Sequence, residues 1–394
     1  MTRLASEVVA HMDNEGSEQP GSIDAPGDRP TWEAPDAFPD RPPTGSYGYK
    51  QGRKLRRCSQ LELVDVCSKD MIPPVRLVWT PDTPYLVPPH EVPFLFDALR
   101  SKTHGNSKLN LGVGLFLAVL LLPRLLSGGE LPIKFFDAII AVVCIVTGIV
   151  GLWRVRTLTR VDMAHEARQA RFDAWVAMQR RGYTPVLAMV LVAVFVVQLF
   201  TGLVESVEAA GLVKPAVHSG QLWRLVTCAM LHGCIPHLYF NVIALVILGR
   251  QVETLTRGPM LAIVFLFSAL IGSIFSLYLM PNATSVGASG GLLGLIGFLA
   301  VLGYRCRRIL PPGFLRSMLI SIVLIAAIGV MGYQFIDNAA HFGGLVGGAC
   351  VGMAYINRGE TVLPIEPSRF AKVLGVVSML IILTAAVGSI RTML

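Results

Sequence analysis

Long apolar runs alternate with short polar segments through most of the chain. A helix needs about 20 predominantly apolar residues to cross the hydrocarbon core of a bilayer. Two apolar stretches within 111–153 predict a membrane hairpin, although Pro123 and Arg124 interrupt its first leg. Later runs predict seven spanning helices, at 185–204, 237–252, 260–280, 286–304, 314–333, 338–356 and 371–390. The pattern therefore predicts an all-α polytopic membrane protein.

The segments before the core are more polar. Residues 1–50 are rich in Pro, Gly, Asp and Glu, so we expect a disordered cytosolic leader. Residues 51–110 are expected to form a small cytosolic appendage or linker. Its apolar positions at 61–66 and 75–79 predict short strands among prolines. Residues 154–183 carry many arginines at amphipathic spacing, which predicts a basic helix on the membrane surface.

The composition supports a membrane protein and limits the function. Of the 394 residues, 53% are hydrophobic and only 15% are charged, which is too apolar for a soluble domain of this size. The formal net charge of +8 does not indicate a nucleic-acid partner, because Arg and Lys gather in short loops and no nucleic-acid motif is present. No early apolar segment has the form of a cleavable signal peptide. The seven cysteines lack zinc-finger spacing, and we interpret most of them as small core residues.

Loop charges predict the orientation of the helices. Lys and Arg concentrate on the cytosolic side of membrane proteins. The loop Pro281–Ser285 and the turn before Asn338 contain neither, so the second, fourth and sixth core helices should begin on the outer side. We expect a multi-pass protein of a plasma or bacterial inner membrane, with a cytosolic N-terminus if both legs of the hairpin cross or neither does. The loops expected to be cytosolic contain Arg250, Arg257, Arg305, Arg307, Arg308, Arg316, Arg358, Arg369 and Lys372.

Four polar residues lie near those outer helix starts: Ser289, His341, His237 and Asn241. Polar groups inside a membrane are costly and usually face a cavity or one another. Glycines recur at four-residue spacing on the fourth and sixth helices, and such faces let backbones approach closely. Close packing would bring Ser289 within hydrogen-bond reach of His341. The glycines concerned are Gly290, Gly294, Gly344, Gly348 and Gly352.

A serine beside a histidine suggests nucleophilic catalysis. The hydroxyl is a weak nucleophile until a base removes its proton, and acyl transfer needs donors aimed at the developing oxyanion. His237 and Asn241 are four residues apart, so they share a helix face and could supply such donors. Asp337 is the only carboxylate near His341, and the simpler arrangement is a Ser–His dyad. The alternatives are a serine used for helix packing and a histidine satisfied within the core.

Short motifs follow one another in a consistent order along these helices. They are Trp223-Arg224, His232-x4-His237-x3-Asn241, Gly287-Ala288-Ser289-Gly290 and Ala340-His341-x-Gly343-Gly344. Together they resemble the rhomboid family of intramembrane serine proteases. The resemblance covers about 184–356 and implies a core of six helices, here followed by a loop and a seventh helix within 357–394.

The resemblance also implies an activity and residue roles. The expected reaction is cleavage of peptide bonds in or near the transmembrane helices of membrane-protein substrates, within the lipid bilayer. Ser289 would be the nucleophile and His341 the base, while His237 and Asn241 would stabilise the oxyanion. Structural roles are implied for His232, Trp223, Arg224 and Glu253.

One position departs from the family pattern. Many members have an aromatic residue four positions after the nucleophile, where it stacks on the histidine, and this chain has Leu293. The alternative function is therefore that of a catalytically inactive rhomboid-like protein that binds transmembrane helices. A transporter is disfavoured because internal repeats and charged midplane residues are not seen. The histidine spacing is not that of a zincin, so neither a metal nor another cofactor is expected.

Overall fold

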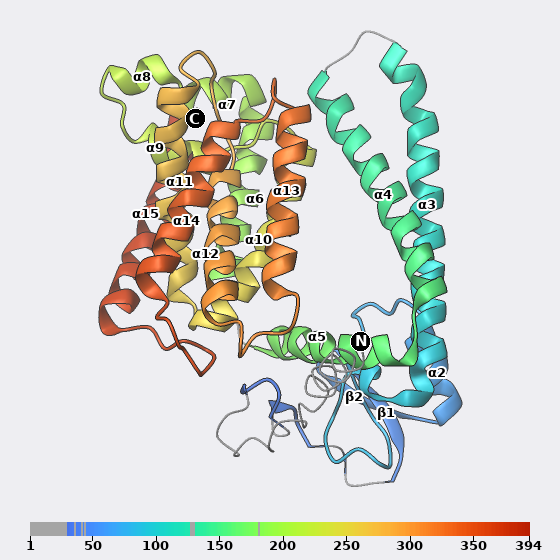
Figure 1. Ribbon diagram of the computed structural model, residues 1–394. Coiled ribbons are helices and arrows are strands. Elements are labelled where there is room, and N and C mark those ends of the chain that lie inside the picture. The colour runs from blue at the N-terminus through green and yellow to red at the C-terminus, as the bar shows by residue number, and fades with distance from the viewer. Residues whose placement is uncertain (1–29, 35–36, 41, 43–44, 127–130, 180–181) are drawn as a thin grey trace, which may run out of the picture.

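The computed structural model describes residues 30–34, 37–40, 42, 45–126, 131–179 and 182–394. A bundle of upright helices stands beside a helical hairpin, α3 (Phe96–Leu126) and α4 (Leu131–Thr157). Both rise from a small domain and from α5 (Arg160–Met178), which lies across the foot of the molecule (Figure 1). Helix α3 begins before the predicted hairpin region starts at 111, and α4 continues past its end at 153.

Seven long helices form the bundle, and α11 is the most enclosed of those that are long and apolar enough to cross a membrane. In its most apolar window 61% of α11 is buried, against 17% for α13, because α11 packs against α12, α14 and α15. The helices are α6 (Tyr183–Thr201), α10 (Ile235–Thr256), α11 (Pro259–Leu279), α12 (Ser289–Arg305), α13 (Phe314–Met331), α14 (Asn338–Tyr355) and α15 (Arg369–Met393).

Seven helices of the described chain are long and apolar enough to cross a membrane: α3, α4, α6, α10, α11, α13 and α15. The predicted spans 286–304 and 338–356 correspond to α12 and α14, which fall outside that set. Helix α12 has only 17 residues, and five buried glycines lower the mean hydropathy of α14. Helix α12 packs against α10, α11, α13 and α14, and α14 packs mainly against α11 and α12. The protein is a multi-pass integral membrane protein.

The two ends of the bundle differ in character. We call the end that carries Arg257, Arg305, Arg307, Arg308 and Arg358 the arginine-rich end. At the opposite end, called here the site end, α10, α12 and α14 begin. The long first loop folds there into short helices, namely α7 (Leu203–Ala210), α8 (Lys214–His218), α9 (Arg224–Thr227) and η4 (Cys228–Met230), as Figure 1 shows.

The small domain lies beyond the arginine-rich end. Its antiparallel sheet has the order β2-β1-β3, formed by β1 (Tyr47–Gln51), β2 (Lys54–Cys58) and β3 (Leu77–Trp79). The strand predicted at 75–79 is therefore present as β3, whereas the strand predicted at 61–66 is wrong. Those residues form helix α2 (Gln60–Ser68), which Ser59 caps by accepting the Glu62 N–H at 3.1 Å. The buried residues Leu63, Val66 and Cys67 have helical spacing. This spacing is hard to recognise in the sequence because other apolar residues lie between them.

Part of the expected leader is folded rather than disordered. The boundary at residue 50 cuts through β1, and Trp32 is fully buried. Its indole meets the Phe172 ring edge-on, with the ring centroids 5.6 Å apart. Its Nε1–H donates to the Ile309 carbonyl at 2.8 Å. Trp32 thus joins α5 to the loop that follows α12. Residues 1–29 lie outside the described residues.

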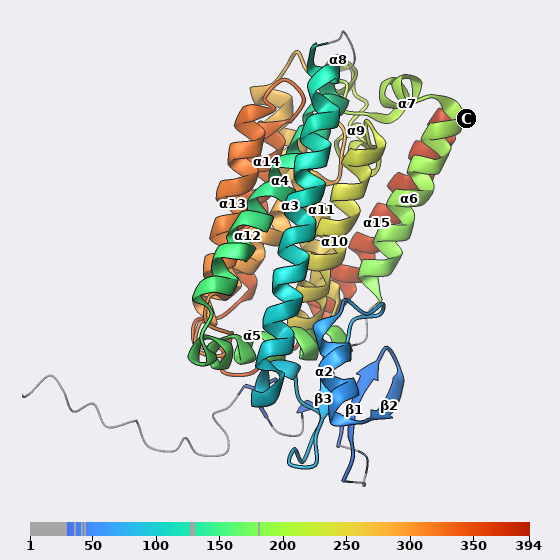
Figure 2. The same ribbon diagram turned by 90° about the vertical axis from the view of Figure 1, so that its right-hand side faces the viewer.

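The predicted surface helix corresponds to α5. Thr159 and Asp162 form a capping box at its start, and Arg171 holds the Glu91 carboxylate with contacts of 3.0 and 3.1 Å. Arg171 also donates to the Trp32 and Ala34 carbonyls at 3.1 and 2.9 Å. One guanidinium therefore connects α5, the small domain and the Trp32 segment. Figure 2 shows α5 beneath the bundle and the small domain beside it.

Candidate functional site

Helices α12 and α14 touch through their backbones. A Cβ placed on Gly344 would lie 2.0 Å from the Gly290 carbonyl oxygen, and one placed on Gly348 would lie 1.8 Å from that of Gly294. No side chain fits at such distances, so only glycine allows this approach. The predicted glycine stripes therefore face each other in the structure.

This contact brings Ser289 and His341 onto adjoining helix ends. Ser289 is the first residue of α12, directly before Gly290. His341 lies in the first turn of α14, one residue after Ala340, whose carbonyl faces Gly290. Both side chains are half-buried. No hydrogen bond joins the two side chains within the described part of the chain, and catalytic hydrogen bonds often tighten only when substrate binds.

The turn before Ser289 is shaped by Gly287. Its φ of +127° is one that side-chain-bearing residues rarely adopt, and its N–H donates to the Cys228 carbonyl at 2.9 Å. A Cβ at Gly287 would lie 2.8 Å from Nε2 of His237. Gly287 therefore leaves room for the His237 ring beside the turn that presents Ser289. The first N–H groups of any helix lack partners within the helix, so the Ser289 end of α12 suits an anionic group.

His237 and Asn241 share one face of α10, as predicted. Asn241 is buried and donates from Nδ2 to the His237 carbonyl at 3.0 Å, which uses one of its two amide hydrogens. His237 lies in the first turn of α10, and His341 lies in the first turn of α14. The four predicted catalytic and oxyanion residues thus converge at the site end from α10, α12 and α14.

His232 lies behind His237. It is fully buried, and its ring meets the His237 ring edge-on at a centroid distance of 5.1 Å. Its backbone is held by the side chain of Gln198, which accepts the His232 N–H at 2.9 Å and donates to its carbonyl at 3.2 Å. Sequence reasoning missed Gln198, although a lone amide in the apolar run 185–204 is a recognisable signal.

Trp223 and Arg224 organise the first loop. The Arg224 guanidinium is buried and lies 4.7 Å from the centroid of the Trp223 ring. It donates to the carbonyls of Glu208 and Gly211 at 3.0 and 2.9 Å. Arg224 therefore holds the last turn of α7 and the residue after it against the start of α9, which keeps the loop folded at the site end.

Glu253 acts at the other end of α10. Its carboxylate accepts the backbone N–H groups of Gly182, Tyr183 and Thr184 at 2.7, 2.8 and 2.9 Å. These are N–H groups at the start of α6, which the helix itself cannot satisfy. Glu253 therefore caps α6 from a neighbouring helix and lies far from Ser289. Leu293, one turn after Ser289, is buried in the core.

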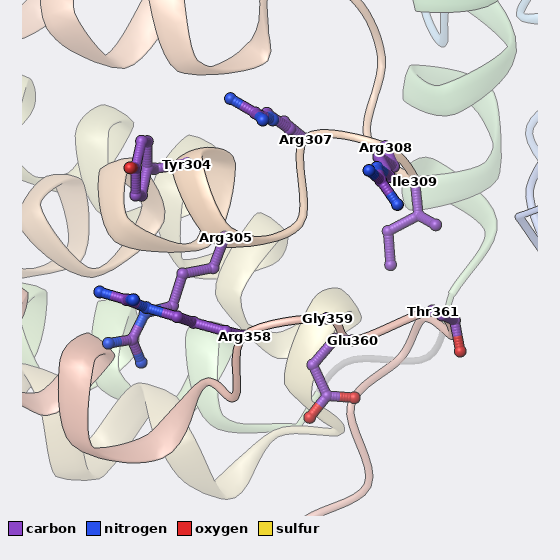
Figure 3. A pocket seen from close by; sticks show the side chains of 9 residues that line it. All are labelled: Tyr304, Arg305, Arg307, Arg308, Ile309, Arg358, Gly359, Glu360 and Thr361. Atoms are coloured by element: carbon purple, nitrogen blue, oxygen red, sulfur yellow. The ribbon is translucent and has the colours of Figure 1, made fainter.

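A pocket of about 470 Å³ opens at the arginine-rich end, away from Ser289 (Figure 3). It lies where α12 and α14 end. Arg305 donates there to the Met353 carbonyl at 2.6 Å and also to the carbonyl of Ile356. Its lining comprises Tyr304, Arg305, Arg307, Arg308, Ile309, Arg358, Gly359, Glu360 and Thr361. The pocket contains none of the predicted site residues.

Comparison with known proteins places this geometry in context. Residues 219–358 match the family model of the Rhomboid domain. The chain is similar to "RHOMBOID-like protein 6, mitochondrial" of Arabidopsis thaliana, at 35% identity over 35% of this chain and 45% of that protein. It is also similar to "Rhomboid protease GluP" of Bacillus subtilis, at 36% identity over 34% of this chain and 26% of that protein.

A third relative is "Rhomboid-like protease 3" of Toxoplasma gondii, at 30% identity over 38% of this chain and 57% of that protein. The chain spans between 26% and 57% of the lengths of these three relatives. On this chain, the similarity to each of the three relatives covers between 34% and 38% of the residues.

Proposed function

Since residues 219–358 of this chain match the family model of the Rhomboid domain, we propose that the protein is an intramembrane serine endopeptidase. Its substrates would be membrane proteins cleaved in or near a transmembrane helix. The observation that carries the proposal is the backbone contact between Gly290 and Gly344, because Ser289 and His341 occupy the helix ends that adjoin it. Two relatives whose names describe them as rhomboid proteases support it.

The proposed reaction has two halves. In the first, the Ser289 Oγ attacks the scissile carbonyl carbon while His341 accepts the hydroxyl proton. His341 then gives that proton to the leaving amine, and an acyl-enzyme remains. In the second, His341 accepts a proton from water, the resulting hydroxide attacks the ester, and Ser289 regains its proton.

The oxyanion of each intermediate needs hydrogen-bond donors. The Ser289 N–H, the His237 ring N–H and the second amide hydrogen of Asn241 are candidates, because all three lie at the site end. Removing one such donor typically lowers kcat by about 10²- to 10³-fold. The polar groups gathered there also provide the hydrated surroundings that hydrolysis requires within a bilayer.

The test is cleavage of a fluorogenic transmembrane substrate by the purified protein. Ser289→Ala and His341→Ala should each abolish cleavage while leaving the thermal unfolding temperature within a few degrees of wild type. Ser101→Ala and His104→Ala on α3 are matched controls and should retain full activity. Full activity of either site variant would overturn the dyad.

The second candidate function is a non-catalytic binder of transmembrane helices. Leu293 favours it, because no aromatic ring is available at this position to support His341. A fluorophosphonate probe separates the two functions, since it labels only an activated serine. Labelling of wild type but not of Ser289→Ala supports the protease, whereas a folded wild-type protein that is not labelled supports the binder.

We further propose that the arginine-rich end is cytosolic and that the site end faces outward. Ser219 and Thr361 are exposed at the site end and the arginine-rich end, respectively. With a membrane-impermeant maleimide applied to intact cells, a cysteine at 219 should be labelled, and a cysteine at 361 only after permeabilisation. The reverse result would invert the topology.

A further inference from the structure

Lys214 is a charged residue buried in the first loop. Only 2% of its surface is exposed, and its Nζ donates to the Ser285 hydroxyl at 2.6 Å. Burial lowers the pKa of the Lys214 ammonium below its ordinary value, while the carboxylate of Asp337 opposes that shift. A buried ammonium costs stability unless hydrogen bonds and an opposite charge compensate it, so its partners define its role.

Those partners form a continuous polar chain. The Ser285 hydroxyl lies 3.1 Å from the hydroxyl of Ser276 on α11, and Ser276 donates to the Oδ2 of Asp337. The Oδ1 of Asp337 accepts the Ala340 N–H at 2.8 Å and thereby caps α14. We call the four linked residues Lys214, Ser285, Ser276 and Asp337 the Lys214–Asp337 chain.

Two members of this chain, Ser285 and Asp337, each lie four positions before a proposed catalytic residue. Ser285 lies four positions before Ser289 and pairs with Leu212 of the first loop, whose N–H donates to the Ser285 carbonyl at 2.9 Å. Asp337 lies one turn before His341, and its carbonyl accepts the His341 N–H at 3.0 Å. The Asp337 carboxylate is thus engaged by Ser276 and by the start of α14. It acts on the position of His341 through the helix.

We propose that Lys214 and Asp337, bridged by Ser285 and Ser276, are positioning residues. They hold the turn before Ser289 and the start of α14 in one arrangement, with the first loop as a third partner. This inference rests on the proposed protease function. The glycine contact fixes how closely α12 and α14 approach, and the Lys214–Asp337 chain fixes how their ends lie relative to each other and to the loop above them.

The nature of the chain favours positioning over stability. Buried ion pairs are often replaceable by apolar residues without loss of stability, so Lys214→Met combined with Asp337→Asn should still fold. Asn is a good helix N-cap, so Asp337→Asn keeps the cap while removing the charge. Misplacement of reacting groups by about 1 Å can cost on the order of 10²-fold in rate.

The experiment measures three quantities for each variant: kcat and KM on the transmembrane substrate, the rate of fluorophosphonate labelling of Ser289, and the thermal unfolding temperature. Lys214→Met should lower kcat and the labelling rate together by about 10- to 100-fold, with little change in KM or in the unfolding temperature. Lys214→Arg should recover part of the loss. Lys372→Met, an exposed lysine of α15, is the matched control and should behave as wild type.

The double variant provides the sharpest test. If the two residues act through one chain, Lys214→Met with Asp337→Asn should lose no more activity than the worse single variant. Unchanged kcat and labelling in Lys214→Met would overturn the inference, as would losses that follow the unfolding temperature or that multiply in the double variant. Cleavage by wild type and its loss in Ser289→Ala are measured alongside, so a failure of the protease function is distinguished from a failure of this inference.

Discussion

Gly344 lies so close to Gly290 that a methyl group on Gly344 would stand 2.0 Å from the Gly290 carbonyl oxygen. Gly344→Ala should therefore force α12 and α14 apart, because the obstacle is backbone and cannot rotate away. Overpacking of this kind costs about 1–3 kcal/mol of stability, and we expect peptide cleavage to fall at least 10-fold as Ser289 and His341 separate. Thermal unfolding and substrate cleavage measure the two effects.

Gly388→Ala in α15 is the control for that substitution. Nothing lies within 4 Å of a Cβ at Gly388, so alanine there should leave activity unchanged and stability equal or slightly higher. Wild-type activity in Gly344→Ala would show that the proposed site does not depend on the glycine contact.

Glu253 should matter for stability more than for chemistry. Its carboxylate satisfies three N–H groups at the start of α6, and each hydrogen bond to a charged group contributes about 1.5–3 kcal/mol. Glu253→Ala should lower the unfolding temperature strongly, while the molecules that remain folded keep a normal fluorophosphonate labelling rate. Glu366→Gln removes an exposed ion pair with Arg257 and should change stability by less than about 1 kcal/mol. Equal unfolding temperatures for the two variants would contradict this role.

The Trp32 anchor should stabilise the junction between α5 and the bundle. Replacing a buried Trp with Ala typically costs about 3–5 kcal/mol. We expect Trp32→Ala to make the N-terminal domain sensitive to proteolysis, detected as an early cut near α5 in limited digestion. Trp153→Ala, which removes a mostly exposed indole on α4, should leave the digestion pattern unchanged. An unchanged pattern in Trp32→Ala would rule out the anchor.

The thiols of the small domain should react in a fixed order as pH rises. Burial raises the pKa of Cys58 to about 11 and that of Cys67 to about 12, from an ordinary value near 9. Thiolates are the reactive species, so iodoacetamide at pH 9 should modify Cys58 slowly and Cys67 more slowly still. Both should react fully after denaturation, and mass spectrometry of the peptide that carries them gives the order. Faster modification of Cys67 than of Cys58 in the native protein would contradict this arrangement.

The raised pKa values of Cys58 and Cys67 also determine how the free energy of unfolding changes with pH. The pKa of each thiol is higher in the folded state than in the unfolded state, so their contribution to the free energy of unfolding is complete below about pH 9 and declines above it. Cys67→Val should weaken this decline. Unfolding curves of wild type and variant at pH 8 and pH 10 measure it, and a decline as steep in the variant as in wild type would contradict the assignment to Cys67.

Hydropathy and spacing were sufficient to predict most of the helical architecture. The apolar runs located the bundle helices because a helix that crosses a membrane needs a long uninterrupted run of apolar residues. The glycine repeats on α12 and α14 predicted that these two helices contact each other, because small residues at four-residue spacing let helix backbones approach closely in a membrane. The shared end of Ser289, His341, His237 and Asn241 followed from loop charges alone.

The remaining features depend on contacts that no local pattern records. Trp32 lies in a polar, proline-rich segment, and only the surface formed by Phe172 and Ile309 explains its burial. Lys214 has the sequence context of an exposed loop cation, yet it is buried and donates to the Ser285 hydroxyl. Helix α2 was mistaken for a strand because four apolar residues in a six-residue run fit both periods.

The Trp32 anchor also bears on how the protein is made. Trp32 binds a carbonyl 277 positions later in the chain, and Thr31 donates to the Leu363 carbonyl 332 positions later. A ribosome releases the N-terminal segment long before either partner exists, so this junction cannot close until nearly every membrane helix has been inserted. Until residue 309 has been made, the Trp32 indole N–H lacks its acceptor in the folded protein. A chain truncated before residue 309 would lack both partners.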